Sequence, residues 1–448
     1  MFMYGYSSFR PVIIVFCLFL GGCSTQQRLG KAAQKTLFND AVLKHAHVGI
    51  DIYDPASGQS LYRYNAEKYF IPASNTKILS CYAGMKYLGD SLQGIRYAIT
   101  DEAVWIRPTG DPTLLHEDYA DQPVIEFLKR QTKPVLLEAD NWKTNALGSG
   151  WSWEDYSYDY MVERSPLPVY GNVIRWYQDI QKDTVNGRPS FSVSSSPEIN
   201  WKVRFDAADQ NSQFSVERSR DENVFLIHQG PEPHARREVP FVTHGLTSSI
   251  ELLRDVTGKQ IQQAAPGASV KSSYAILKSR PTDSLLRPMM YRSDNFFAEQ
   301  ILLMVSDRLL GYMNEEMVID TLLKTDLKEL PQAPRWVDGS GLSRYNLFSP
   351  MDFVFLLNKM QHEFGMERVK TVFPAGGKGT LSSYYQNLSS SLYAKTGSLG
   401  GVICLSGYLL TRKQRWLLFS VLVNNHQGSG AHIRKQVESF LQQVYQSY

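Results

Sequence analysis

Residues 70–89 read FIPASNTKILSCYAGMKYLG. Apolar side chains recur every three to four residues from Ile78 to Leu88 and Gly89 follows them, a pattern that predicts a helix with one buried face. Ser74 and Lys77 fall in the first turn of this helix, three residues apart and therefore on one face. A serine beside a lysine amine at a helix N-terminus is suited to acyl transfer, with the serine as nucleophile and the amine as its base. Taken alone, the pair also fits a surface serine that caps a helix.

A second motif, Ser293-Asp294-Asn295, interrupts a run that is otherwise apolar and helical in pattern. We expect it to form one wall of a cleft, where Ser293 relays a proton to the leaving amine and Asn295 hydrogen-bonds the substrate. The same residues also fit an N-cap or Asx turn that starts the following helix, and the motif by itself does not separate the two interpretations.

A third motif, Lys395-Thr396-Gly397-Ser398, lies on a predicted strand. Lys395 beside the hydroxyl groups of Thr396 and Ser398 is suited to holding a substrate carboxylate. We expect Gly397 to let a substrate backbone approach closely. The backbone N–H of Ser398 would donate to the oxyanion together with that of Ser74. An exposed edge-strand lysine is the alternative for this motif on its own.

The order of the three motifs decides between these alternatives. S-x-x-K, S-D-N and K-T-G in this order are typical of penicillin-binding proteins and class A β-lactamases, which form an acyl-enzyme on the serine. Burial and a second cation, such as Lys395, would both lower the pKa of Lys77 and allow it to accept the Ser74 proton. The sequence contains no H-E-x-x-H motif and no paired C-x-x-C motif, so we expect neither a metal nor a cofactor.

The composition is ordinary for a soluble globular protein. Of 448 residues, 43% are apolar and 20% are charged, and the formal net charge is +3. This balance gives no electrostatic argument for nucleic acid as a partner. The length exceeds that of one typical core and predicts two domains, or one domain with a large insertion.

The beginning of the chain resembles a bacterial lipoprotein leader. Arg10 precedes an apolar run over residues 12–20, which is too short for a membrane-spanning helix, and small residues then lead to Cys23. We expect residues 1–22 to be an export signal, Cys23 to be lipidated, and residues 23–30 to be a polar tether. The protein would then be lipid-anchored in a bacterial membrane and face the periplasm. An ordinary signal peptide, with Cys23 incidental, is the alternative.

Two cysteines remain in the folded part of the chain, Cys81 and Cys404. An exported protein could join them as a disulfide. Both lie in apolar stretches, so we expect two buried thiols that act as small hydrophobic side chains.

The remaining periodicities predict an α/β (α+β) domain that is split by an insertion. Helix patterns cover residues 31–46, 283–302, 315–330, 350–364 and 433–445, and strand patterns cover 48–54, 61–64, 392–395, 402–410 and 416–423. Between them, strand-like runs occur at 103–108, 134–140, 224–230 and 239–244, with a helix near 248–256. We therefore assign residues 31–90 and 272–448 to one domain and residues 91–271 to a mainly β inserted domain.

Several further stretches resemble the S13 peptidases, which are D-alanyl-D-alanine carboxypeptidases and endopeptidases among the low-molecular-mass class C penicillin-binding proteins. These stretches are Gly110–Leu114, Gly150–Asp155, Asp338–Arg344, Gly376–Leu381 and Leu405–Tyr408. The long segment between Ser74 and Ser293 is similar to that of this family, whose members carry extra domains there, whereas class A β-lactamases keep it far shorter. The resemblance covers residues 40–425 and implies a penicillin-recognising serine transpeptidase/β-lactamase-like domain.

The resemblance also implies the roles of individual residues. Ser74 would be acylated, Lys77 would be the base, Ser293 and Asn295 would line the second wall, and Lys395, Thr396 and Ser398 would recognise a terminal carboxylate. The implied substrates are peptidoglycan stem peptides ending in D-Ala-D-Ala, and the implied inhibitors are β-lactam antibiotics. Two departures stand out: the insertion is shorter than in the longest members, and Ser398 stands where threonine is commoner, which preserves the hydroxyl.

Two other functions remain as alternatives. A serine β-lactamase needs a route for rapid hydrolysis of the acyl-enzyme, and the sequence contains no convincing E-x-x-L-N segment for that purpose and no Y-x-N at the second motif. A non-catalytic peptidoglycan-binding lipoprotein does not need an intact nucleophile, base and carboxylate clamp. Within the peptidase hypothesis, both carboxypeptidase and endopeptidase activity fit the sequence.

Overall fold

The structure, a computed structural model, describes residues 25–182, 189–206, 213–270 and 273–448. The predicted export signal and Cys23 lie outside these residues. These described residues divide into two compact units: unit 1 lies within the ranges Met1–Asn75, Glu329–Arg335 and Leu347–Tyr448, and unit 2 lies within Thr76–Lys328 and Trp336–Asn346. The predicted inserted domain, residues 91–271, falls wholly within unit 2, and its boundaries stay a prediction.

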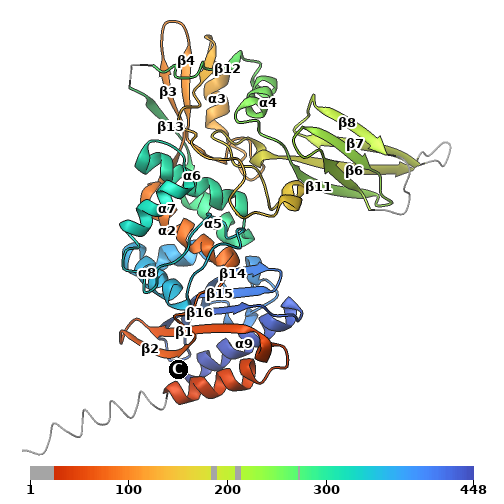
Figure 1. Cartoon of the computed structure of the whole chain (residues 1–448). Helices are drawn as coiled ribbons and strands as arrows, with labels where there is room; N and C mark the ends of the chain where they lie inside the picture. Colours follow the sequence, from red (N-terminus) through yellow and green to blue (C-terminus); the bar gives the residue numbers. More distant parts are fainter. Residues whose placement is uncertain (1–24, 183–188, 207–212, 271–272) are drawn as a thin grey trace, which may run out of the picture. The chain divides into compact units, whose positions relative to one another are not determined.

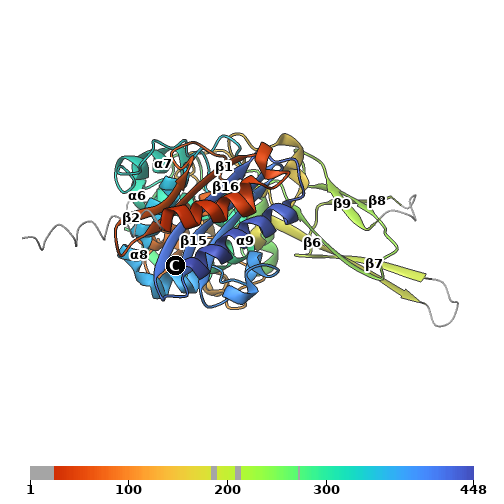
Figure 2. The same ribbon diagram turned by 90° about the horizontal axis from the view of Figure 1, so that it is seen from below.

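Unit 1 is built on a five-stranded antiparallel sheet of order β14-β15-β16-β1-β2 (Figure 1). Its strands are β1 (His47–Asp54), β2 (Gln59–Tyr64), β14 (Leu392–Leu399), β15 (Val402–Leu410) and β16 (Trp416–Asn424). The central strand β16 and its neighbour β15 are buried almost throughout, because helices pack on the sheet. Helix α8 (Pro350–Val372) contacts β1, β15 and β16, and α9 (Gly430–Ser447) contacts β15. Figure 2 shows α9 beside the N-terminal helix, over the sheet.

Most elements predicted for unit 1 are confirmed, including all five strands and the helices that begin near residues 350 and 433. The helix predicted over residues 31–46 is wrong in extent. Residues 25–33 are α-helical, Gln34–Phe38 form a π-helical turn, and Leu43–His45 form a separate 3-10 turn. The cause is Asp40, whose carboxylate accepts hydrogen bonds from the backbone N–H groups of Val42 and Leu43 at 2.9 and 3.0 Å and so starts a new turn.

Unit 2 contains a group of helices around α2 (Lys77–Tyr87). Both α5 (Asp283–Arg292) and α6 (Asn295–Leu310) contact α2, and α7 (Glu315–Lys324) contacts α6. The single helical stretch predicted over residues 283–302 is therefore two helices. Ser293 closes α5 in the left-handed conformation with φ +61°. Asp294 then caps α6 by accepting a hydrogen bond from the backbone N–H of Phe297 at 2.9 Å, so the N-cap considered for this motif is present.

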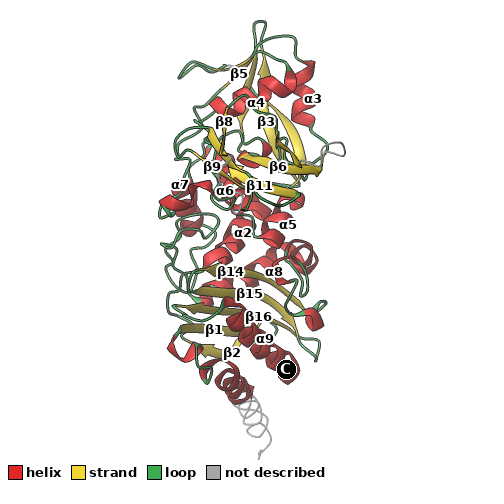
Figure 3. Ribbon diagram, turned by 90° about the vertical axis from the view of Figure 1, so that its right-hand side faces the viewer, coloured by secondary structure: helices red, strands yellow, loops and turns green. Residues whose placement is uncertain are grey.

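The described part of unit 2 also holds three sheets (Figure 3). They have the orders β12-β5-β4-β3-β13, β8-β10-β9 and β11-β6-β7. The strands are β3 (Ser91–Ile99), β4 (Val104–Pro108), β5 (Val135–Leu137), β6 (Val173–Lys182), β7 (Pro189–Ser196), β8 (Lys202–Asp206), β9 (Ser215–Arg218), β10 (Val224–His228), β11 (His234–Pro240), β12 (Ile261–Gln263) and β13 (Ala275–Pro281). These sheets share one apolar core with α3 (Pro123–Arg130) and α4 (Thr247–Thr257).

The predictions for this region are confirmed in part. Strands β4, β5 and β10 and helix α4 occur where the sequence predicted them. The strand predicted over residues 239–244 is wrong in position, because β11 ends at Pro240. The short helix α3 and the strands β3, β6, β7, β8, β9, β12 and β13 were not predicted. Strand β13 pairs with β3, and its alternating pattern is too short and too polar to be distinguished from a loop.

Both remaining cysteines are buried thiols outside any disulfide: Cys81 on α2 in unit 2 and Cys404 on β15 in unit 1. The expectation of two buried thiols is confirmed. Among the described residues, none of the helices combines the length and the apolar character that crossing a membrane requires.

Candidate active site

Ser74 lies in the 3-10 turn Ala73–Thr76, immediately before α2. Its side chain is half-buried, and Ala73 before it has φ +47°, a conformation that costs energy in a residue with a Cβ atom. The neighbouring Asn75 is fully buried and donates a hydrogen bond from Nδ2 to the Ser406 hydroxyl on β15 at 2.7 Å. A buried side-chain hydrogen bond therefore fixes the turn that presents Ser74 to the sheet of unit 1.

The third motif lies on β14, next to the same turn. A Cβ atom built on Gly397 would lie 2.6 Å from the carbonyl oxygen of Pro72 and 3.1 Å from the backbone nitrogens of Ser74 and Asn75. Real Cβ atoms do not approach backbone atoms so closely, so a glycine is required here. The close approach involves the turn that carries Ser74, which the sequence did not reveal.

The polar side chains of the third motif have partners within unit 1. Lys395 is fully buried, and its Nζ donates a hydrogen bond to the carbonyl oxygen of Thr396 at 2.7 Å. The Thr396 hydroxyl donates to the Thr380 hydroxyl at 2.8 Å. Arg434 on α9 donates from Nη2 to the exposed Ser398 hydroxyl at 2.8 Å. Three hydroxyl groups and two cations thus belong to this motif and its direct partners, which suits a carboxylate ligand.

Lys77 is the first residue of α2, and its side chain is fully buried in unit 2. Its Nζ donates hydrogen bonds to Oδ1 of Asn295 at 2.6 Å and to the carbonyl oxygen of Ser340 at 2.7 Å. Burial lowers the pKa of Lys77 to about 8, while the nearby carboxylates of Asp338 and Asp294 oppose this shift. The amine is therefore neutral in roughly one molecule in ten at pH 7, far more often than an exposed lysine, and can act as a general base.

The second motif contributes to the same half of the site. Asn295 starts α6; its side-chain Oδ1 accepts the hydrogen bond from Lys77, and its Nδ2 donates to the backbone carbonyl oxygen of Tyr160 at 2.8 Å. Within unit 2, the structure thus brings the predicted base and the second motif together. Ser293 lines a cavity together with Asp294 and Asn295.

The Ser340 carbonyl is held by a compact loop that sequence reasoning assigned to the family resemblance but to no function. The buried Asp338 carboxylate accepts hydrogen bonds from the backbone N–H groups of Gly341 and Ser343 at 2.8 and 2.7 Å, and from the Asn346 side chain. Gly339 lies against α6, where an added Cβ would be 2.6 Å from the carbonyl oxygen of Ala298. The loop is therefore fixed by backbone contacts and one buried carboxylate.

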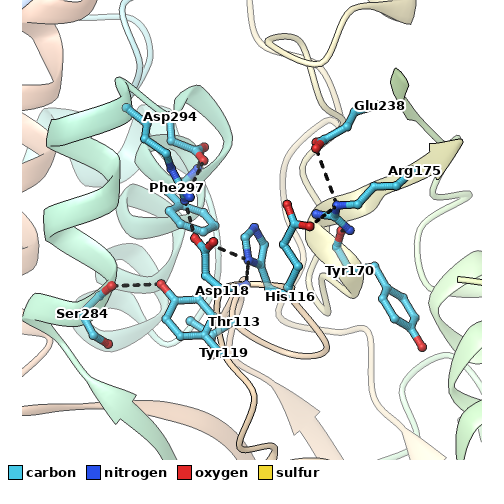
Figure 4. Close-up of polar contacts among 12 residues, drawn as sticks. Thr113, His116, Asp118, Tyr119, Tyr170, Arg175, Glu238, Ser284, Asp294 and Phe297 are labelled. Atoms are coloured by element: carbon cyan, nitrogen blue, oxygen red, sulfur yellow. Dashed lines mark hydrogen bonds and ion pairs between the residues drawn. The ribbon is translucent and has the colours of Figure 1, made fainter. Parts of the chain in front are cut away.

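A cavity of about 1070 Å³ opens beside the second motif within unit 2. Its charged lining residues are Glu117, Asp159, Arg175, Glu217, Arg218, Arg236, Arg237, Glu238, Arg292 and Asp294. Part of the wall is seen in Figure 4, where Arg175 points toward Glu238 and His116 lies beside Asp118. Burial lowers the pKa of His116 to about 4, so this ring is neutral at pH 7. The cavity is large enough for several residues of a peptide.

The part of the chain that the structure describes contains no group of three or more His, Cys, Asp or Glu side chains arranged to hold a metal ion. The chemistry available at Ser74 and Lys77 is that of a hydroxyl nucleophile and an amine base, which needs no metal.

The family follows from a comparison over most of the chain. Residues 31–444 match the model of the D-Ala-D-Ala carboxypeptidase 3 (S13) family. The chain belongs to this family. It is a serine-type peptidase of the D-alanyl-D-alanine carboxypeptidase class, and the resemblance drawn from the sequence is confirmed.

Known relatives agree with this assignment. D-alanyl-D-alanine carboxypeptidase DacB of Haemophilus influenzae is 23% identical over 424 residues, which cover 85% of this chain and 86% of the relative. Penicillin-sensitive carboxypeptidase A of Dictyostelium discoideum is 22% identical over 446 residues, covering 84% and 82%. The crystal structure of penicillin-binding protein 4 (dacB) from Haemophilus influenzae superposes with a TM-score of 0.73 at 20% identity, over 93% of this chain and 99% of that one. The predicted penicillin-recognising fold is thereby confirmed.

Several residues of the site were not found from the sequence alone. Glu299 on α6, Arg434 on α9 and Arg164 in a loop lie outside the three motifs, and a single charged residue gives no signal of its partner in the sequence. Asp338 and Ser340 could have been found, because they belong to a Gly- and Ser-rich stretch whose tight turns require anchoring.

Proposed function

We propose that Ser74 is the nucleophile of a D-alanyl-D-alanine peptidase that acts on peptidoglycan stem peptides. The Ser74 oxygen attacks the carbonyl carbon of the penultimate D-Ala residue, while Lys77 takes the hydroxyl proton. The bond to the last residue breaks, its nitrogen receives a proton through Ser293, and an ester on Ser74 remains. Water then hydrolyses the ester, which restores the Ser74 hydroxyl and releases the shortened peptide.

The observation that carries this proposal is the environment of Lys77. A fully buried amine with a pKa of about 8, bonded to Asn295 of the second motif, is costly unless it serves a purpose. Such an amine can accept a proton near neutral pH, which an ordinary exposed lysine cannot.

Lys395, Thr396 and Ser398 are proposed to bind the carboxylate of the terminal D-Ala. Support comes from the clustering of hydroxyl groups around this motif and from the Arg434 guanidinium that donates to Ser398. The carboxylate of a β-lactam antibiotic offers the same chemistry, so penicillin should acylate Ser74 as well.

Labelling with a fluorescent penicillin tests the function. We expect a stable covalent adduct on the wild-type protein and none on Ser74→Ala, with both proteins showing the same thermal unfolding. Rapid turnover of penicillin would instead indicate the β-lactamase alternative. Absence of labelling in the wild-type protein would indicate the non-catalytic wall-binding alternative. Digestion of purified muropeptides then separates release of free D-Ala from cleavage of cross-links.

We further propose that the protein is exported and held at a bacterial membrane by a lipid on Cys23. The support is the leader-like sequence before this residue, with Arg10 and the apolar run over residues 12–20. Metabolic labelling with a radioactive fatty acid should mark the wild-type protein and not the Cys23→Ser variant. A Cys23→Ser variant that is still labelled and still sediments with membranes would contradict the anchor.

A further inference from the structure

A buried carboxylate outside the three motifs forms a hydrogen bond with Ser340, the residue whose carbonyl oxygen contacts Lys77. Glu299 on α6 is 1% exposed. Its Oε1 accepts a hydrogen bond from the backbone N–H of Ser340 at 2.7 Å, and the carbonyl oxygen of the same Ser340 accepts one from Lys77 Nζ at 2.7 Å. Glu299 therefore holds the residue whose carbonyl receives the lysine hydrogen.

The second oxygen of Glu299 binds a buried arginine. Nη1 of Arg164 lies 3.3 Å from Glu299 Oε2, and its Nη2 lies 3.0 Å from Glu315 Oε1. Arg164 Nη2 also donates to the carbonyl oxygens of Asn145 and Leu147. The arginine is completely buried. Burying a guanidinium away from water is costly unless it has charged partners, and Glu299 and Glu315 are such partners for Arg164.

The charged groups around Lys77 within unit 2 come from three places. Asp294 lies at the start of α6, Glu299 one turn further along it, and Asp338 on the loop that carries Ser340. All three carboxylates raise the pKa of Lys77 against the larger effect of burial. Burial and Asp338 raise the pKa of Glu299 to about 7, and the Arg164 charge opposes this shift. The charge of Arg164 thus favours the ionised carboxylate.

We propose that Glu299, held by Arg164, is the positioning residue of the general base Lys77: it fixes the Ser340 carbonyl that receives the lysine hydrogen, and its negative charge keeps the amine basic enough to take the Ser74 proton. The inference rests on the proposed function. It assigns to residues 145–164 of the predicted insertion a part in building the base, since Arg164 and its carbonyl partners come from there.

Two variants of Glu299 separate its position from its charge. In both, the rate of acylation by a fluorescent penicillin is measured from pH 6 to pH 10. Glu299→Gln keeps the size and an acceptor oxygen but removes the charge. We expect the rising limb of its profile to move about one unit to lower pH, and the plateau to fall on the order of tenfold, because the base is weaker. Glu299→Asp keeps the charge but withdraws it from Ser340, so we expect a lower plateau with the limb near its wild-type position.

Arg164→Gln changes the protonation of Glu299 without replacing Glu299 itself. Removing the positive charge favours protonation of Glu299, so we expect the limb to move to lower pH as it does in Glu299→Gln. If Glu299→Gln does not fold, the pH profile of Arg164→Gln tests the proposal. If Arg164→Gln does not fold, the profile of Glu299→Gln tests it, because Arg164 keeps Glu315 as a partner in that variant.

The control is Asp352→Asn in unit 1. Asp352 is also a buried carboxylate that accepts backbone N–H groups, those of Ser349 and Gln332, but it has no bond to the surroundings of Lys77. We expect its limb and plateau to match the wild-type protein. The proposal is overturned if Glu299→Gln and Arg164→Gln leave the limb unmoved, whether or not the plateau falls. Labelling of Ser74→Ala would instead overturn the function on which the inference rests.

Discussion

The surroundings of Lys77 in unit 2 and those of Ser74 in unit 1 are built in different ways. Around Lys77 lie buried charges, with Glu299, Asp338 and Arg164 each bonded to several polar groups. Around Ser74 lie backbone atoms and hydroxyl groups, with β14 so close to the nucleophile turn that only Gly397 fits. The region around Lys77 controls the protonation of an amine, and the region around Ser74 controls the position of a backbone turn.

The difference predicts which substitutions each region tolerates. A change of charge at constant volume should damage the Lys77 region, because the protonation of the amine depends on neighbouring carboxylates. A change of volume at constant charge should damage the Ser74 region, because its backbone segments are already in contact. Substitutions that change either the charge alone or the volume alone therefore test whether the two regions differ in this way.

The largest effect is expected for Lys77→Met, which keeps a long unbranched side chain and removes the amine. Acylation by penicillin should slow on the order of a thousandfold, since a positioned base contributes about 10²–10⁴ in rate. The fold should persist, because methionine suits a fully buried position. A stopped-flow measurement of labelling against thermal unfolding checks both expectations.

Lys77→Arg is the matched control, because it keeps a cation but cannot lose its proton near neutral pH. We expect it to be as slow as Lys77→Met. In the wild-type protein, the acylation rate should rise with pH through about 8, because the pKa of Lys77 is lowered to that value and the neutral amine is the active form. An active Lys77→Arg variant, or a rate that falls over this range, would contradict the role of the amine as base.

The next effect is expected for Gly397→Ala on β14. The added Cβ would meet the carbonyl oxygen of Pro72 at 2.6 Å, so the strand or the nucleophile turn must move. We expect a loss of roughly 1–3 kcal/mol in the free energy of unfolding together with slower acylation. Gly30→Ala is the control in the same unit, since its Cβ would find its nearest neighbour at 3.6 Å. Equal stability of the two variants would show that the backbone contact is not tight.

The sequence predicted the elements of unit 1 better than the site of unit 2. Strands β15 and β16 could be predicted because the sheet buries them in continuous apolar runs. The break at Ser293 was only one of two interpretations of its motif, because the pattern is helical on both sides of the left-handed serine and the capping aspartate. Local polar bonds of this kind override the apolar periodicity.

The same contrast holds for the candidate site. Ser74, Lys77 and Asn295 could be proposed because short motifs keep their spacing. The partnership of Glu299 and Arg164 could not, since the two residues are far apart in the chain and each is also compatible with a solvent-exposed position. Tertiary packing decides whether an ion pair is buried, and the spacing of apolar residues in the sequence does not report it.

A smaller effect is expected for Asn75→Ala, which removes the hydrogen bond between the nucleophile turn and Ser406. We expect a loss of about 1 kcal/mol in the free energy of unfolding, because the Ser406 hydroxyl keeps a second partner in Ser420 at 2.8 Å. A double-mutant cycle with Ser406→Ala in chemical denaturation measures the coupling between the two side chains. Additive effects would mean that this bond does not fix the turn.

The smallest effect is expected for Arg434→Gln on α9. The guanidinium donates to the Ser398 hydroxyl at 2.8 Å. It therefore adds a second positive charge to the third motif, beside that of Lys395. Because Arg434 is only partly buried, its removal should change the free energy of unfolding by less than about 0.5 kcal/mol. The KM for a peptide ending in D-Ala-D-Ala should rise a few-fold with little change in kcat, since a ground-state contact to the carboxylate is weakened. Lys435→Gln removes an exposed charge from the next position of the same helix and should leave KM unchanged. If both variants raise KM equally, the effect comes from general surface charge and not from a specific contact of Arg434. Arg434 would then not belong to the carboxylate site, and the difference between the surroundings of Lys77 and those of Ser74 would stand without it.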